Sequence, residues 1–321
     1  MHGGFPAGAY GPEQDRRSRW IDLGGPVHYL DFGGPSGGPV VVAVHGLGGS
    51  AYNWSAIAPL LTDRCRVLAP DLAGHGFTQS RGRSTSVRAN RLLLHRFVEA
   101  VPASPVILVG NSMGGMVALL EAEAAPDAVA GLVLIDAALP FIPALPDPLV
   151  AGLFTAYATP GVGRFIMSRR RAMSAEKQVA MVLGICCADP SRVPAEVVAE
   201  HVELARRRAG LVNVERDFLV AARSVVATAG PVRGMSYRRG IGSVRAPVLL
   251  VHGDRDRLVP LAASRAVARR HPSWQLVVVP GVGHVPQLEA PRETADAVLG
   301  WLDAAGSPAA AAATHAPATA G

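Results

Sequence analysis

A serine enclosed by glycines, in the segment GNSMGG at residues 110–115, constrains this chain more than any other feature. An apolar run of strand type at 106–109 precedes it, and a helix-period segment rich in Ala and Leu follows it. A strand that turns sharply into a helix would expose the hydroxyl of Ser112 at the turn. Gly110 and Gly114, two residues away on either side, leave room for so strained a turn. The pattern therefore indicates a nucleophilic serine.

Strand-type and helix-type segments alternate along most of the chain. After a predicted hairpin at 20–23 and 27–32, buried strands are predicted at 39–44, 65–69, 106–109, 131–135, 247–251 and 274–279. Helices are predicted near 53–61, 86–101, 113–125, 261–270 and 291–302. This alternation predicts an α/β fold with an eight-stranded, mostly parallel sheet and helices on both faces.

The alternation stops between residues 139 and 241, where helical patterns are broken by prolines. We expect a helical cap insertion there, lying over the sheet, and a core domain made of residues 20–138 and 242–304. Residues 1–19 are rich in Gly, Pro and charge and are expected to be a flexible segment. The Ala/Pro/Thr-rich residues 305–321 are expected to be a disordered tail.

Three candidate catalytic residues each follow a predicted strand, where the active site of such a sheet lies. They are Ser112, Asp256 and His284, in the chain order Ser, Asp, His. A serine hydroxyl needs a base, here His284, and the base needs an orienting acid, here Asp256. Asp254, in the same loop, is expected to brace the turn. Asp136, directly after the strand at 131–135, is the alternative acid.

The developing oxyanion needs backbone N–H donors. One is expected from Met113, directly after the serine. The other is expected from Leu47, in the Gly-rich loop HGLGG at 45–49. Both would act through the backbone, so that their side chains can vary.

Several segments together resemble the α/β-hydrolase superfamily over roughly residues 20–304. They are HGLGG at 45–49, Trp54, PD at 70–71 with GHG at 74–76, GNSMGG at 110–115, GDRD at 253–256 with VP at 259–260, and GH at 283–284 with Glu289 and Pro291. The resemblance implies a cofactor-independent serine hydrolase whose cap shapes the acyl or alcohol pocket. It also favours Asp256 over Asp254 as the acid. His45, Asp71 and His75 match family positions usually interpreted as structural.

Within this superfamily, the GNSMGG segment is similar to that of meta-cleavage-product C–C hydrolases, where the Asn helps to bind the dienoate. Asn111 and Val285 are therefore candidate substrate-binding residues. Val285 stands where those enzymes often have an aromatic residue, and the loop at Leu47 also departs from theirs. Ser112 excludes the aspartate nucleophile of epoxide hydrolases and haloalkane dehalogenases.

The expected function is hydrolysis of carboxylic esters of small apolar or acyl-chain substrates through an acyl-enzyme. C–C bond hydrolysis and cofactor-free perhydrolysis are the alternatives, and a non-catalytic ligand-binding protein is a third hypothesis. A minority of the apolar cap residues are expected to line a hydrophobic substrate cavity. Arg164 and the arginines at 169–171 could meet a substrate carboxylate, but a solvated face is the favoured interpretation.

Composition excludes several other classes. The net charge of +6 comes from arginines that are scattered or in short triplets without interleaved aromatic residues, so no nucleic-acid partner is expected. Cys65, Cys186 and Cys187 predict neither a disulfide framework nor a metal site. No stretch approaches the roughly 20 apolar residues of a membrane span, and no secretory signal is visible. A cytoplasmic enzyme without cofactor or metal, acting on a small-molecule ester or acyl substrate, is expected.

Overall fold

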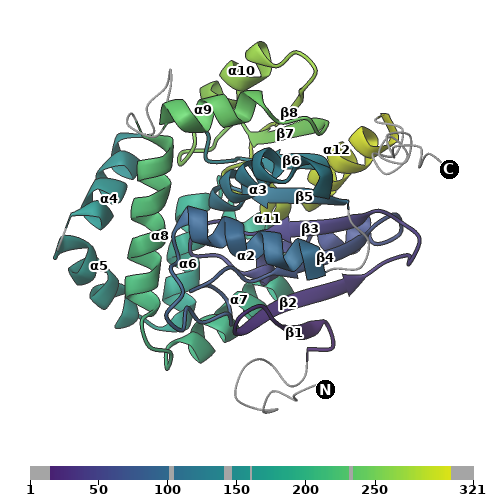
Figure 1. Cartoon of the computed structure of the whole chain (residues 1–321). Helices are drawn as coiled ribbons and strands as arrows, with labels where there is room; N and C mark the ends of the chain where they lie inside the picture. Colours follow the sequence, from purple (N-terminus) through teal and green to yellow (C-terminus); the bar gives the residue numbers. More distant parts are fainter. Residues whose placement is uncertain (1–14, 101–104, 141–146, 160, 231–233, 305–321) are drawn as a thin grey trace.

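The computed structural model describes residues 15–100, 105–140, 147–159, 161–230 and 234–304 (Figure 1). An eight-stranded sheet forms its centre, in the order β1-β2-β4-β3-β5-β6-β7-β8. Strand β2 is antiparallel to both neighbours, and every pair from β4 to β8 is parallel. The predicted eight-stranded, mostly parallel sheet is therefore confirmed. Its strands are β1 (Ser18–Asp22), β2 (Pro26–Gly33), β3 (Val40–Val44), β4 (Arg66–Pro70), β5 (Val106–Asn111), β6 (Val129–Ile135), β7 (Val248–Gly253) and β8 (Gln275–Val279).

Helices cover both faces of the sheet because alternate residues of the central strands point to opposite sides. Val42 and Leu108 belong to the apolar cluster under α2, α3 and α10, whereas Val41 and Val109 belong to the cluster under α1 and α12. The core helices are α1 (Ala58–Leu61), α2 (Val87–Ala100), α3 (Met113–Ala124), α10 (Leu261–Arg270), α11 (Pro286–Glu289) and α12 (Pro291–Ala304), with short 3₁₀ turns η1 (Ala51–Trp54) and η2 (Pro126–Ala128).

Two details of the local prediction need correction. The single helix expected at 53–61 is two short elements, η1 and α1, because Ser50 caps the first and Pro59 lies in the first turn of the second, where its missing N–H costs no helical hydrogen bond. Ser18 and Arg19, expected in the flexible N-terminal segment, belong to β1. The other predictions for residues 1–14, and those for 305–321, lie outside the described residues.

Between β6 and β7, the described residues form helices and no strand. They are α4 (Pro148–Ala158), α5 (Val162–Arg171), α6 (Ala175–Cys186), η3 (Pro190–Arg192), α7 (Ala195–Arg208), α8 (Val214–Ala229) and α9 (Gly234–Gly242). Tyr157, Met167 and Leu219 join α4, α5 and α8, while α6 and α7 pack against Val285 and Leu288 of the core. We call residues 139–241 the helical insertion; its boundaries as a separate domain stay a prediction.

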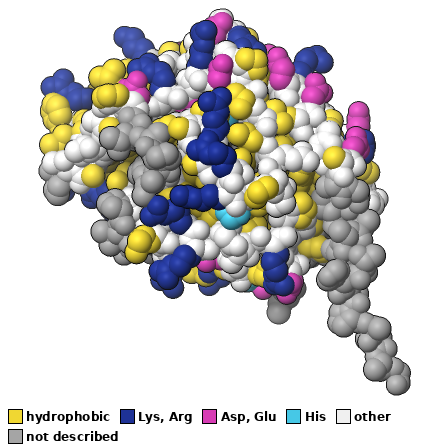
Figure 2. All heavy atoms as spheres, turned by 90° about the horizontal axis from the view of Figure 1, so that it is seen from above, with side chains coloured by type: hydrophobic (Ala, Val, Ile, Leu, Met, Phe, Trp, Pro, Cys, Tyr) yellow, Lys and Arg dark blue, Asp and Glu magenta, His cyan; other side chains and the backbone are white. Residues whose placement is uncertain are grey.

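Charged side chains are dispersed over the face of the molecule that Figure 2 shows. Figure 2 shows Lys and Arg side chains scattered there among hydrophobic and neutral atoms, not joined in one patch. Across the described parts of the chain, none of the helices combines the length and the apolar character needed to span a bilayer.

Candidate active site

Ser112 stands on a strained turn between β5 and α3. Its backbone has φ 55° and ψ −118°, a region that a side chain other than glycine rarely adopts. A Cβ on Gly110 would lie 2.6 Å from the backbone of Gly114, and a Cβ on Gly114 would overlap the carbonyl of Val44. Only glycines allow this packing of the turn against β3, so the spacing of the motif has a steric cause.

His284 and Asp256 meet at the ends of β8 and β7. Nδ1 of His284 lies 2.8 Å from Oδ2 of Asp256, whose side chain is fully buried. Oδ1 of Asp256 accepts from the N–H groups of Leu258 and Val259, at 2.7 and 3.1 Å. Burial alone would raise the pKa of Asp256, but His284 and the hydrogen bonds outweigh it and hold that pKa below its usual value. The ionised acid therefore orients the imidazole and leaves Nε2 as its free nitrogen.

Asp136, the alternative acid, lies beside Asp256 and makes no hydrogen bond to His284. Its Oδ1 accepts from the N–H of Gly253 at 3.1 Å. Burial first, and then the negative charge of Asp256, raise the pKa of Asp136 well above 3.8. The raised pKa favours an uncharged Asp136 beside the ionised Asp256, and Oδ2 of Asp136 has no hydrogen-bond partner among the described residues. The geometry favours Asp256 as the partner of the histidine.

His252 completes this buried cluster, and the sequence did not single it out. Its Nδ1 lies 2.8 Å from Oγ of Ser264, and its Nε2 lies 3.0 Å from the carbonyl of Val259. Asp136, His252 and Asp256 are the one group of described residues with ligand atoms close enough to hold a metal, all within 4.8 Å. Both nitrogens of His252 already have partners, so the cluster suits hydrogen bonding better than metal binding.

The expected oxyanion loop lies beside the serine. Gly46 adjoins Ser112 so closely that a Cβ on the glycine would be 3.1 Å from Cβ of the serine. His45 fixes the loop, because its Nδ1 contacts the carbonyl of Gly46 at 2.8 Å and its Nε2 accepts from the N–H of the β4 loop at residue 72. Within the described chain, the N–H groups of Leu47 and Met113 donate to no protein acceptor. Both remain available as the predicted oxyanion donors.

With this geometry established, the comparisons decide the family. Residues 41–297 match the model of the alpha/beta hydrolase family. The chain belongs to this family. The α/β-hydrolase is similar to a pimeloyl-[acyl-carrier protein] methyl ester esterase of Aromatoleum aromaticum, with 32% identity over 80% of the chain and 95% of that protein. It is also similar to Lipase 1 of Psychrobacter immobilis, with 27% identity over 87% of the chain and 81% of that protein.

A solved structure extends the likeness to the whole fold. A thermophilic esterase from Thermogutta terrifontis superposes with a TM-score of 0.67, at 25% identity, over 89% of this chain and 98% of that one. The resemblance stated from the sequence motifs is thus confirmed. The hydrolase is related to esterases and lipases at the level of the family.

Glu289 holds the histidine loop of the hydrolase in place. Its fully buried carboxylate accepts from the N–H groups of Gly283 at 2.8 Å, Ala188 at 3.1 Å and Asp189 at 2.7 Å. One side chain thus joins the loop before His284 to the end of α6. In the sequence, Glu289 stood out only as part of the family resemblance. Its partner Asp189 in the insertion is 100 residues away, and no local sequence pattern indicated this contact.

Asn111 and Val285 are both buried beside His284. The side-chain nitrogen of Asn111 donates to the carbonyls of Ile135 at 3.1 Å and His284 at 3.0 Å. The side chain of Asn111 therefore links the turn that carries Ser112 to the histidine loop. Val285 packs in an apolar cluster with Val179 and other residues of α6 and α7. A substrate-binding role for Asn111 and Val285 stays a prediction.

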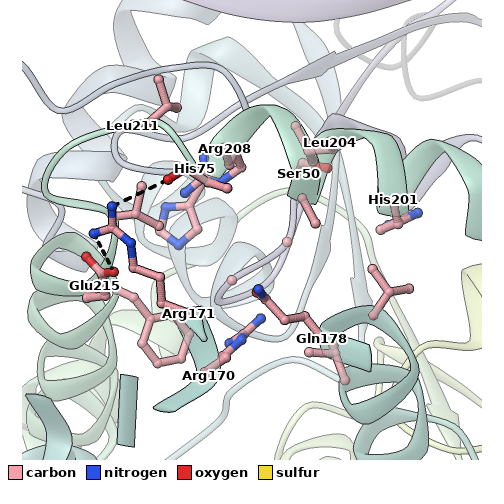
Figure 3. Close-up of a pocket in the computed structure, with 18 of the residues that line it drawn as sticks. Ser50, His75, Arg170, Arg171, Gln178, His201, Leu204, Arg208, Leu211 and Glu215 are labelled. Atoms are coloured by element: carbon pink, nitrogen blue, oxygen red, sulfur yellow. Dashed lines mark hydrogen bonds and ion pairs between the residues drawn. The ribbon is translucent and has the colours of Figure 1, made fainter. Parts of the chain in front are cut away.

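Two further predictions concern residues around the site. Asp254 accepts from the N–H of Gly281 at 2.6 Å, as expected of a residue that braces the turn. Asp71, expected to be structural, accepts from the N–H groups of Ala51 and Phe77 at 2.7 and 2.8 Å. Met167 and Leu183, two of the apolar residues of the insertion, line a cavity of about 160 Å³, and Figure 3 shows this cavity in close-up.

Proposed function

We propose that this α/β-hydrolase is a serine esterase that cleaves carboxylic esters of small apolar or acyl-chain substrates through an acyl-enzyme. The observation that carries the proposal is the 2.8 Å contact between His284 and the buried, ionised Asp256. The backbone of that histidine is hydrogen-bonded to Asn111, the residue before Ser112. The names of its relatives, esterases and lipases, support an ester as the substrate.

In the proposed reaction, Oγ of Ser112 attacks the ester carbonyl while Nε2 of His284 takes the hydroxyl proton. Asp256 stabilises the imidazolium, and the N–H groups of Leu47 and Met113 stabilise the oxyanion. When the tetrahedral intermediate collapses, His284 returns the proton to the leaving alcohol. His284 then activates a water molecule that attacks the acyl-enzyme, releases the carboxylic acid and regenerates the serine.

C–C bond hydrolysis and perhydrolysis would use the same three residues. The first depended on Asn111 binding a dienoate, and its side-chain nitrogen is engaged by two backbone carbonyls. No contact in the described residues favours either reaction over ester hydrolysis. A purely binding protein would not need the triad.

The test combines a fluorophosphonate probe with p-nitrophenyl esters of increasing acyl length. We expect the probe to label Ser112 alone and the wild type to cleave the shorter esters. Ser112→Ala should lose labelling and lose roughly 10⁴-fold or more in kcat, as removal of a serine nucleophile does. Labelling without ester cleavage would favour the other serine-based reactions. If the probe does not label Ser112 and no ester is cleaved, the enzymatic proposals are refuted.

A further inference from the structure

A cavity of about 160 Å³ lies between the helical insertion and two loops of the core (Figure 3). Helices α5, α6, α7 and α8 supply most of its wall, and the core loops at 48–50 and 74–75 supply the rest. This volume has room for several water molecules, so it suits a short chain of atoms.

Arg170, on α5, directs its guanidinium towards this cavity (Figure 3). With respect to the residues that the structure describes, it makes no hydrogen bond and no ion pair, and its Cζ lies 5.8 Å from the ring centroid of Phe218. Burial lowers the pKa of Arg170, yet an arginine keeps its charge in proteins. A partly buried cation without a partner is unfavourable in the free protein.

The other cavity arginines differ, because each already has acceptors. Arg171 donates to Oε1 of Glu215 at 3.1 Å, and Arg208 donates to the carbonyl of Gly74 at 3.0 Å. Arg170 is thus the one cavity arginine whose guanidinium has no hydrogen-bond acceptor among the described residues.

Two buried acceptors face the same space. Nδ1 of His75 lies 3.0 Å from the carbonyl of Ala73, and Nδ1 of His201 lies 2.8 Å from that of Val197. A carbonyl only accepts, so both Nδ1 atoms carry the hydrogen and both Nε2 atoms are acceptors. Neither Nε2 has a partner among the described residues. These two nitrogens could accept from an N–H or O–H group of a ligand, but they do not attract a carboxylate, which has no hydrogen to donate.

The cavity adjoins both halves of the candidate active site. Its core loop at 48–50 continues directly from Gly46, which packs against Ser112. On the other side, Leu183 lines the cavity one turn before Cys186, whose carbonyl accepts from the N–H of His284 at 2.6 Å. The cavity therefore lies next to the elements that hold Ser112 and His284, although neither residue lines it.

We propose that this cavity is a subsite for the free carboxylate of an acidic ester, with the Arg170 guanidinium as its ligand. The inference rests on the proposed esterase activity, because the ester carbonyl would lie at Ser112 while the carboxylate lies in the cavity. A planar guanidinium presents paired N–H donors that match the two oxygens of a carboxylate. The substrate class is a monoester of a short dicarboxylic acid, or an ester of a short hydroxy acid.

The experiment compares acidic esters with neutral esters of equal length. Monoethyl glutarate is paired with ethyl pentanoate, and acetoxybutanoate with butyl acetate, and acid release is followed by titration. We expect the wild type to prefer the acidic member of at least one pair by about tenfold or more in kcat/KM. Arg170→Met should lower kcat/KM for that ester by about 10- to 100-fold, the value of a charged hydrogen bond, and leave the neutral ester nearly unchanged.

Two further variants control the comparison. Arg169→Met removes an adjacent, exposed arginine that lies over Phe165 and should leave the preference intact. Arg170→Lys keeps the charge but loses the paired donors and should fall between wild type and Arg170→Met. The melting temperature of Arg170→Met should be no lower than that of wild type, since the variant removes an unpaired cation.

Binding of glutarate to Ser112→Ala, measured by calorimetry, separates this inference from the proposed function. Binding that Arg170→Met abolishes in that background supports the subsite. If no ester is cleaved while such binding persists, the esterase proposal fails and the anion site stands. Equal glutarate binding with and without Arg170 overturns the subsite. Equal kcat/KM for both members of each pair in the wild type overturns it as a substrate site.

Discussion

The loops around Ser112 and the cavity under the helical insertion differ in whether their buried charged side chains have partners. In the catalytic loops, buried carboxylates meet their donors: Asp256 faces His284, and Glu289 accepts from three N–H groups. In the cavity, Arg170 has no such partner among the described residues. In the catalytic loops the folded chain itself supplies the partners of the charged groups, whereas in the cavity a ligand supplies the partner of Arg170.

The difference follows from where the two regions lie in the fold. Ser112, Asp256 and His284 follow β5, β7 and β8, and the parallel register of the sheet brings the ends of those strands together. The cavity lies between four helices of the insertion and two core loops, so its shape depends on tertiary packing and not on strand register.

The largest expected effect is on the acid. Asp256→Asn should lower kcat by about 10⁴-fold, because an amide cannot hold the imidazole in the required tautomer or stabilise its charged form. Asp136→Asn is the matched control, since Asp136 makes no hydrogen bond to His284 and its raised pKa favours the uncharged form, which an amide resembles. Its kcat should fall by about tenfold at most, about the value of one hydrogen bond. Steady-state kinetics on a p-nitrophenyl ester decides; the reverse order would assign the catalytic acid to β6.

A smaller effect is expected on the connection between the two regions. Glu289→Gln should lower the free energy of unfolding by about 3 kcal/mol. In the wild type three N–H groups donate to the carboxylate, whereas in the variant the NH₂ group of the amide would face one or more of those N–H groups. Urea unfolding at neutral pH measures it. Glu293→Gln is the control, because that carboxylate is exposed and lies 3.7 Å from Arg192; its loss should cost about 0.5 kcal/mol or less. Equal costs would mean that Glu289 does not hold the histidine loop.

Sequence reasoning predicted the first region far better than the second. Unbroken apolar runs and the glycines around Ser112 are local signals, and they sufficed for the sheet and the turn. The pairing of Glu289 with residues 188–189 depends on tertiary contacts that no local pattern records. Arg169, Arg170 and Arg171 are identical neighbours that a helix points in three directions about 100° apart. The expected solvated face describes Arg169 and Arg171, but packing turned Arg170 towards the cavity.

The same limit applies to the acids at the ends of β6 and β7. From the sequence, Asp136 and Asp256 were alternatives for one role. In the fold they lie side by side: burial and then the charge of Asp256 raise the pKa of Asp136, while the contacts of Asp256 with His284 outweigh burial and lower the pKa of Asp256. The two residues therefore have complementary roles, which only their proximity could reveal.

The smallest expected effect tests that pairing through pH. The native pKa of Asp136 lies above the usual 3.8, so above about pH 4 the native protein holds a proton that the unfolded chain has released. The contribution of Asp136 to the free energy of unfolding must then decrease as pH rises, by at most about 1.4 kcal/mol per pH unit. This decrease ends when the pH passes the native pKa of Asp136. Asp136→Asn lacks this titration. The difference in unfolding free energy, wild type minus variant, should therefore fall between about pH 4 and neutrality. Asp127→Asn, an exposed control whose side chain is 97% accessible, should give a flat difference. A flat difference for Asp136→Asn as well would mean that Asp136 titrates like a surface carboxylate.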